Sequence, residues 1–402
     1  MKREIGQLAE DEVQRVVESA FGEDFVFRSP KRDDDGNEVT DVLALWDDVA
    51  LILQAKAQAE SPLWRPGRSP VEWSRKHLEK AIKQANGAAR TILAGRMSAL
   101  QNRRRGQIAF TRERFPHLYG LVVIHDDSSP YDAQQLCPDL AKSAVPLQVM
   151  GLDDLTAVAS VFDTPGDLIN YLEHRGDMLV AHLRPKVHEE YRVIEYYLEH
   201  LEGLLIARAR AMNQELSVSD VTPYANEMRT IARGQHPDFA AGMVIDDVIR
   251  QLHDVDDNLR MPGAQFAGGR AHYAEVATEL SGVTRPRRIR LGRTLLDLID
   301  KASTSGRDTF RTIRSQRRDQ CIMLWASLRE PSERAERAQD LAMYTTLAKE
   351  YYGLSKAFGI ATEGYVGIGR SYDVVLAEFE TMPSDEAERL GLAIFGPRDA
   401  LT

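Results

Sequence analysis

Residues 40–58, TDVLALWDDVALILQAKAQ, constrain the fold of this chain more than any other stretch. Two apolar runs rich in strand-forming residues flank the pair Asp47-Asp48. This pattern predicts two antiparallel strands joined by a two-residue turn. With the turn at that pair, the numbers of directly opposed residues sum to 95, so that Trp46 lies opposite Val49. Because side chains alternate between the two faces of a strand, the turn position fixes which residues share a face.

This register brings three polar side chains together. Asp41 lies directly opposite Gln54, and Lys56, two residues further on, projects from the same face. Directly opposed Cβ atoms in a strand pair lie about 5 Å apart. The hairpin therefore predicts that a carboxylate, an amide oxygen and an ammonium group converge on one side of a sheet.

Hydrolysis of a phosphodiester bond uses these chemical groups. Mg²⁺ or Mn²⁺ prefers hard oxygen ligands, lowers the pKa of a bound water and neutralises charge on the phosphate. We expect Asp41 to be the metal-bridging carboxylate, Gln54 a ligand through its side-chain oxygen, and Lys56 the group that positions water and stabilises charge. The alternative is a surface ion pair between Asp41 and Lys56, which would contribute less than about 1 kcal/mol.

The hairpin resembles the metal-binding hairpin of the PD-(D/E)XK superfamily, in particular its Mrr-like branch and the related NERD nucleases, which often have Gln-x-Lys in place of Glu-x-Lys. The resemblance covers about residues 4–175. It implies an α/β fold with a restriction-endonuclease-like N-terminal domain, a central mixed sheet flanked by helices. It also implies a metal-dependent endonuclease with Mg²⁺ or Mn²⁺ as cofactor, DNA as the substrate, and a role in phage defence, restriction or repair.

The same resemblance assigns further residues. GQLAEDEVQRVV is similar to the family's first helix, whose acidic residue completes the metal shell; Glu10 is the match and Glu12 the second choice. Gln84 is similar to a glutamine on the helix after the hairpin. Two departures are clear. Thr40 replaces the proline of the superfamily's name, and Gln54 leaves the site with one carboxylate fewer than the Glu form.

Charge is unevenly distributed along the chain. The net charge is −10, yet residues 61–115 hold thirteen Lys/Arg against three Glu, and residues 285–318 hold eleven Lys/Arg against three Asp. Because salt screens distant charges within about 10 Å, local cation density decides phosphate affinity. The two basic segments therefore favour a nucleic-acid partner, although solvated helix faces would have the same composition.

The first basic segment predicts a contact surface. In a helix from Val71 to about Leu100, one face carries Lys76, Lys80, Lys83 and Gln84, and we expect that face to follow a phosphate backbone. The expected extension of this surface is Arg103, Arg104 and Arg105. The second basic run, Arg285 to Arg293, fits either a nucleic-acid or partner contact or an exposed loop, and both interpretations stay open.

Composition limits the remaining choices. No stretch approaches 18 consecutive apolar residues, no apolar signal core follows the N-terminus, and there are two cysteines. We therefore expect a cytoplasmic protein with no membrane contact, no disulfide framework and no cysteine zinc site. His125 to Asp127 follows a predicted strand and favours a strand-end turn over a metal site. The chain has no P-loop motif and so no evident ATP motor.

The length of 402 residues predicts two or three domains. We expect a nuclease-like domain at residues 1–185, a mainly helical middle region at 186–318 and a small α/β domain at 319–402. Two alternatives to the nuclease remain. The first domain is then a catalytically inactive module that binds nucleic acid, or the C-terminal half is a protein-interaction or sensor region that binds a second copy or a partner protein.

Overall fold

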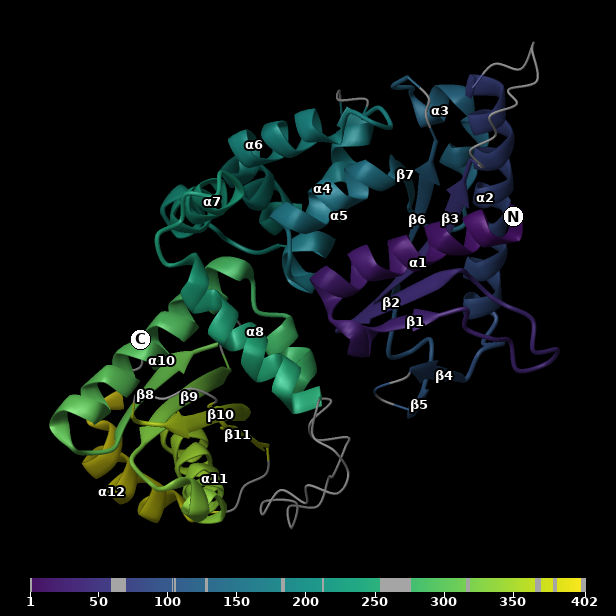
Figure 1. Ribbon diagram of the computed structural model, residues 1–402. Helices are drawn as coiled ribbons and strands as arrows, with labels where there is room; N and C mark the ends of the chain where they lie inside the picture. Colours follow the sequence, from purple (N-terminus) through teal and green to yellow (C-terminus); the bar gives the residue numbers. More distant parts are fainter. Residues whose placement is uncertain are drawn as a thin grey trace. The chain divides into compact units, whose positions relative to one another are not determined.

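The computed structural model describes residues 2–58, 70–102, 104, 106–126, 129–181, 185–211, 213–253, 276–315, 319–365, 370–378 and 382–398. The chain divides into two compact units, Met1–His236 and Pro237–Thr402. Both are α/β, which confirms the predicted fold class at that level (Figure 1). Each unit is described by itself.

The first unit is built on a five-stranded mixed sheet in the order β1-β2-β3-β6-β7. The pairs β1–β2 and β2–β3 are antiparallel, while β3–β6 and β6–β7 are parallel. The strands are β1 (Val26–Arg28), β2 (Val42–Trp46), β3 (Val49–Ala57), β6 (His117–His125) and β7 (Leu147–Gly151).

The predicted hairpin and its register are confirmed. β2 and β3 pair from Val42 opposite Leu53 to Trp46 opposite Val49, so the residue numbers sum to 95 at each pair. The two aspartates form the turn, and Asp47 takes a φ of 52°. Asp residues tolerate this left-handed conformation better than most, which explains why an Asp-Asp pair serves here.

Helices cover both faces of this sheet. Helix α2 (Pro70–Leu93) packs its apolar stripe, including Ala88 and Ile92, against Ala50 and Ile52 of β3. Because β3 alternates, Gln54 and Lys56 project from this same face. Helix α1 (Lys2–Phe21) contacts β1, β2 and β3, and α4 (Leu152–Val161) contacts β6. Helix α5 (Pro165–Ala181) follows the predicted break at Thr164-Pro165.

The region after α2 differs from the prediction. The helix ends at Leu93 rather than near Leu100, because Gly95 adopts a φ of 64° that ends helical hydrogen bonding. A two-stranded hairpin of β4 (Ala99–Asn102) and β5 (Gly106–Ala109) follows. Short helices complete the unit: η1 (Glu23–Phe25), α3 (Ala133–Leu136) and η2 (Pro138–Lys142).

A buried ion pair fixes the next helices to the first unit. Helices α6 (Glu190–Ala211) and α7 (Val218–Ala232) pack on each other. The Arg175 guanidinium on α5 donates to both carboxylate oxygens of Glu190, at 2.6 and 2.8 Å, and both side chains are almost completely buried. Arg175 also donates to the Gln148 side chain and the Val149 carbonyl on β7. The start of α6 is therefore bound to the sheet.

A histidine makes a second link at the start of α6. His188 has a φ of 70°, and its Nε2 lies 2.6 Å from Asp126 Oδ1 at the end of β6. Asp126 also accepts from the Ser74 hydroxyl on α2. This agrees with the expected strand-end turn at His125–Asp126; Asp127 lies outside the described residues. The hydrogen bond to Asp126 raises the pKa of His188 above its usual 6.5, against the opposing effect of burial.

The His188 link predicts a pH-dependent stability. A histidine whose pKa is raised in the folded state stabilises fully below its unfolded pKa, and the effect is lost as pH rises through the folded pKa. We expect wild type to exceed His188→Asn in stability below about pH 6.5 and to approach it in alkaline buffer. Asparagine tolerates the left-handed backbone, so backbone strain is matched. Urea unfolding midpoints of both proteins across this range provide the measurement. A difference that does not change with pH would contradict the prediction.

The second unit has a four-stranded sheet in the order β11-β10-β9-β8, with β9 and β10 parallel. Apolar clusters lie on both faces. Ile322, Leu324 and Ile360 pack against α8 and α10, whereas Met323 and Trp325 pack against α11. The elements are α8 (Phe239–His253), α10 (Arg285–Ser305), β8 (Thr309–Arg314), β9 (Gln320–Ser327), η3 (Pro331–Glu333), α11 (Arg334–Tyr352), β10 (Lys356–Glu363), β11 (Tyr372–Ala377) and α12 (Ser384–Phe395).

The two units do not follow the three-part division expected from the sequence. Helices α6 and α7, assigned to a separate middle region, belong to the first unit, whereas α8 and α10 belong with the C-terminal sheet. The reason is physical: the apolar stripes of α8 and α10 are buried only against Ile322, Leu324 and Ile360. Within the described part of the chain, none of the helices combines the length and apolarity that crossing a bilayer requires.

Candidate active site

Asp41 lies immediately before β2, at the point where β1, β2 and β3 meet. The Asp41 carbonyl accepts from the Ser29 amide at 2.9 Å, and its Oδ2 accepts from the Ala55 amide at 2.7 Å. The residue is 6% exposed. The backbone of both neighbouring strands therefore fixes the carboxylate in place.

Lys56 projects toward this carboxylate. Its Nζ lies 3.5 Å from Asp41 Oδ2 and donates to the Ala55 carbonyl at 2.6 Å. The lysine side chain is 14% exposed, which leaves one side of the ammonium group accessible. The sequence-predicted meeting of Asp41 and Lys56 is therefore present in the structure.

Gln54 is the most deeply buried member of the predicted set, at 2% exposure. Its Nε2 donates to the Thr40 hydroxyl at 3.0 Å, and Thr40 donates to the Leu53 carbonyl at 2.7 Å. Within the described residues, Gln54 Oε1 is buried and has no hydrogen-bond donor. Leaving such an acceptor unsatisfied costs about 1–3 kcal/mol. A bound cation would satisfy this oxygen.

Helix α1 brings Glu10 toward the hairpin. Burial raises the pKa of the Glu10 carboxyl first, and the charges of Asp41 and Glu38 raise it further. Arg28 offsets part of this effect, with its Nη2 3.8 Å from Glu10 Oε2. Glu12, the second choice from the sequence, is instead paired with Arg15 on the surface. Glu10 is thus the helix residue that interacts with Asp41.

Glu38 is a site residue that the sequence analysis missed. It is exposed, and its carboxyl lies within hydrogen-bonding reach of the Ser29 hydroxyl and of Asp41. Burial of its inner side, followed by the neighbouring charge of Asp41, raises its pKa. The available signal was its position three residues before Asp41, in a segment that must return to the hairpin.

The donor set fits a hard divalent cation in chemistry, since it offers carboxylate and amide oxygens. Glu10, Glu38 and Asp41 surround one ammonium group, and the Gln54 oxygen has no donor in the described structure. The side chains are not gathered into a preformed cage. Among the described residues, no group of three or more His, Cys, Asp or Glu side chains is arranged to hold a metal ion.

The basic face of α2 lies on the same side of the sheet as Gln54 and Lys56. Its predicted residues are all exposed: Lys76, Lys80, Lys83 and Gln84. His77 stacks on Trp73 with ring centroids 4.1 Å apart. Burial lowers the pKa of His77, and the charges of Lys76, Lys80 and Lys56 lower it further. His77 therefore senses both the helix face and the lysine of the hairpin.

The predicted arginine extension is not a free cationic surface at its one described position. Arg104 Nη1 lies 3.3 Å from Glu23 Oε2, and its Nε lies 3.7 Å from Asp24 Oδ2. Its side chain is only 19% exposed. These carboxylates at the end of α1 neutralise its charge. Arg103 and Arg105 lie outside the described residues.

The second basic run forms the start of α10 and is largely internal. Arg285 and Arg288 are 4% and 5% exposed, and both pair with Asp246 on α8. Arg293 pairs with Asp238, and burial lowers the pKa of Arg287 to about 10. This segment is not an exposed loop. Its arginines hold α8 and α10 together.

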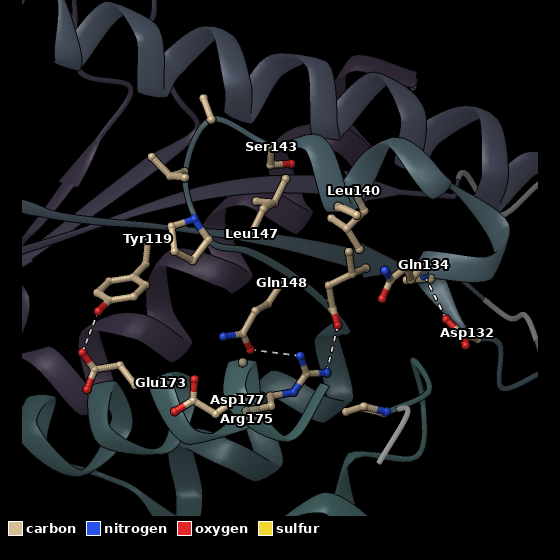
Figure 2. A pocket seen from close by; sticks show the side chains of 18 of the residues that line it. Tyr119, Asp132, Gln134, Leu140, Ser143, Leu147, Gln148, Glu173, Arg175 and Asp177 are labelled. Atoms are coloured by element: carbon tan, nitrogen blue, oxygen red, sulfur yellow. Dashed lines mark hydrogen bonds between the residues drawn. The ribbon is translucent and has the colours of Figure 1, made fainter. Parts of the chain in front are cut away.

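A separate cavity of about 800 Å³ lies along β7, the edge strand of the first sheet (Figure 2). Gln148 and Arg175 line one part of it, and the Tyr119 hydroxyl donates to Glu173 at 2.7 Å in another. None of the predicted site residues lines this cavity. Its lining mixes acidic, basic and apolar side chains, so it does not indicate one class of ligand.

Comparison with known proteins does not assign a family. No protein-family model, no curated protein and no solved structure matches the chain.

Proposed function

We propose that the first unit is a metal-dependent endonuclease of the PD-(D/E)XK type, which hydrolyses phosphodiester bonds in nucleic acid, with DNA as its substrate. One observation carries this proposal. The Lys56 ammonium lies 3.5 Å from the Asp41 carboxylate, next to an amide oxygen of Gln54 that is buried without a donor in the described structure. A structural ion pair needs no such oxygen, whereas a cation site does.

Each residue has a distinct role in this proposal. Asp41, Gln54 and Glu10 would hold Mg²⁺ or Mn²⁺. A bound ion of this kind activates water and neutralises charge on the phosphate. Lys56 orients the attacking water and stabilises the negative charge that develops on the phosphate oxygens. Its ammonium can do so because Asp41 Oδ2 and the Ala55 carbonyl fix its position.

Two further features support a nuclease domain of this type. The first unit has the element order helix, hairpin, helix, strand, strand around a mixed sheet. The exposed lysines of α2 lie on the same sheet face as Gln54 and Lys56, so a phosphate backbone bound there would pass the hairpin.

Cleavage of supercoiled plasmid by the full-length protein tests the proposal. We expect nicked and linear products with Mg²⁺ or Mn²⁺ and none with excess EDTA, because activation of water depends on the ion. Parallel reactions with single-stranded DNA and with RNA identify the substrate. Absence of metal-dependent cleavage on all three would contradict the proposal.

A second candidate function is supported by the neutral side chain of Gln54. An amide contributes no charge to a cation site, which favours a module that binds nucleic acid through α2 without cutting it. In that case the same reactions give no product, while a gel-shift assay shows binding that Lys76, Lys80 and Lys83 support. The C-terminal unit would then act as an interaction or sensor region.

A further inference from the structure

The candidate cation site has a charge deficit at Gln54. Two carboxylates predicted from the sequence, Asp41 and Glu10, face the Lys56 ammonium and the Arg28 guanidinium. A divalent cation bound by only these two carboxylates would compete with two resident positive charges. A site of this composition needs further negative charge to hold Mg²⁺ or Mn²⁺ firmly.

Glu38 lies where such a charge is needed. The segment leading to β2 folds back through a bridge between Lys31 and Glu38 and through the Val39 amide, which donates to the Pro30 carbonyl at 2.8 Å. These contacts place the Glu38 carboxyl within hydrogen-bonding reach of Asp41 and close enough to Glu10 for their charges to interact. Glu38 is also exposed, so an ion from solvent can reach it.

Three like charges beside one another are unfavourable unless a counter-charge joins them. The resident cations are already engaged: Arg28 pairs with Glu10 and Asp11, and Lys56 pairs with Asp41. Burial and mutual repulsion raise the pKa values of both Glu10 and Glu38, which agrees with a shortage of positive charge.

The Gln54 amide gives an independent indication that the missing charge is a bound ion. Its Oε1 is buried with no donor in the described structure, while its Nε2 is held by Thr40, the residue next to Asp41. A metal ion is the species that both an unsatisfied amide oxygen and a group of carboxylates can bind.

We propose that Glu38 is a ligand of the site and supplies the carboxylate that Gln54 does not. This inference rests on the proposed function, because it assigns a ligand to the same cation. It makes Glu38 and position 54 interchangeable sources of one negative charge.

The charge exchange gives the test, with Mn²⁺ binding to the full-length protein measured by calorimetry in the absence of nucleic acid. We expect Glu38→Gln to weaken Mn²⁺ binding by about tenfold or more. The double variant Glu38→Gln/Gln54→Glu is expected to regain most of that affinity. Asp34→Asn is the matched control, since Asp34 lies in the same segment but pairs with Arg32, and it should bind Mn²⁺ like wild type.

The outcomes separate the inference from the proposed function. Wild-type protein that binds Mn²⁺ and cleaves DNA, together with an equally tight Glu38→Gln variant, would overturn the role of Glu38 alone. A weakened Glu38→Gln that Gln54→Glu fails to rescue would also overturn it, provided the thermal melting temperatures agree. Wild-type protein without Mn²⁺ binding would remove both the inference and the nuclease proposal.

Discussion

Changing Lys56 to methionine is expected to slow metal-dependent cleavage by about 100- to 1000-fold, the cost of removing one group that stabilises transition-state charge. Asp41→Asn should slow it at least as much, because the amide keeps the shape of the carboxylate but not its charge. Both variants should fold, since an asparagine oxygen can still accept from the Ala55 amide. Single-turnover cleavage of a labelled duplex, with circular dichroism as the folding check, provides the measurement.

A lysine on α2 provides the matched control for this experiment. Lys83→Met removes the same charge from an exposed helix position. We expect it to weaken DNA binding and to lower the salt dependence of binding by about one phosphate contact, with little change in the single-turnover rate at saturation. Equal losses of rate in Lys56→Met and Lys83→Met would assign both lysines to binding and contradict the catalytic role of Lys56.

The part of the site that lies within the hairpin could be predicted from sequence because its determinants are local. The turn at Asp47-Asp48 and the two-residue alternation fix the register of β2 and β3. That register alone places Gln54 and Lys56 on one face and brings Asp41 within 3.5 Å of Lys56. The exposed face of α2 follows from helical periodicity in the same way.

The features that the sequence did not indicate depend on contacts between distant segments. Glu38 reaches Asp41 only because residues 31–38 fold back on themselves. Arg104 is neutralised by Glu23 and Asp24, about eighty positions earlier in the chain. The pairing of Arg285 and Arg288 with Asp246 is equally distant. A run of arginines looks the same in sequence whether it meets phosphate or buried carboxylates, since only the fold supplies the partners.

The same limit applies to the division of the chain. Helical periodicity continues from α6 to α10, so no change of pattern marks the boundary near residue 236. Which sheet buries each helix decides that boundary, and this depends on apolar surfaces that the sequence lists but does not pair.

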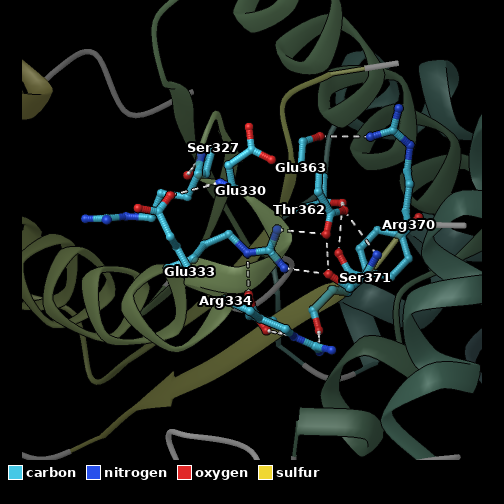
Figure 3. A network of polar contacts seen from close by, with 12 residues as sticks. Ser327, Glu330, Glu333, Arg334, Thr362, Glu363, Arg370 and Ser371 are labelled. Atoms are coloured by element: carbon cyan, nitrogen blue, oxygen red, sulfur yellow. Dashed lines mark hydrogen bonds and ion pairs between the residues drawn. The ribbon is translucent and has the colours of Figure 1, made fainter. Parts of the chain in front are cut away.

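The largest expected effect on stability concerns the second unit, where Arg337→Met should destabilise the fold by about 3–5 kcal/mol. The Arg337 side chain is 1% exposed and donates to Asp373, which is equally buried; its Nη1 lies 3.0 Å from Glu363 Oε1. Figure 3 shows the surrounding network, in which Ser371 donates to Glu363 at the end of β10. Removing the guanidinium leaves two carboxylates buried without their cation.

The pKa of Glu363 shows how strongly this network favours the charged form. Burial by itself would raise the pKa of this carboxyl, but hydrogen bonds from Ser371 and Arg337 outweigh burial and lower it to about 2. A carboxyl with a lowered pKa contributes stability above its unfolded pKa, and this contribution is lost as pH falls toward the folded value. The destabilisation by Arg337→Met should therefore be full at neutral pH and smaller in acid.

Arg329→Met is the control, because Arg329 pairs with Asp340 and Glu336 on the surface, with a side chain 31% exposed. Exposed pairs of this kind contribute less than about 1 kcal/mol, so this variant should unfold nearly as wild type does. Hydrogen exchange of amides in β9 and β10, compared with those in β3 and β6, measures the loss in the second unit. Equal protection in the two variants would mean that the buried network adds nothing to stability, and that an uncharged methionine side chain packs there as well as the guanidinium of Arg337.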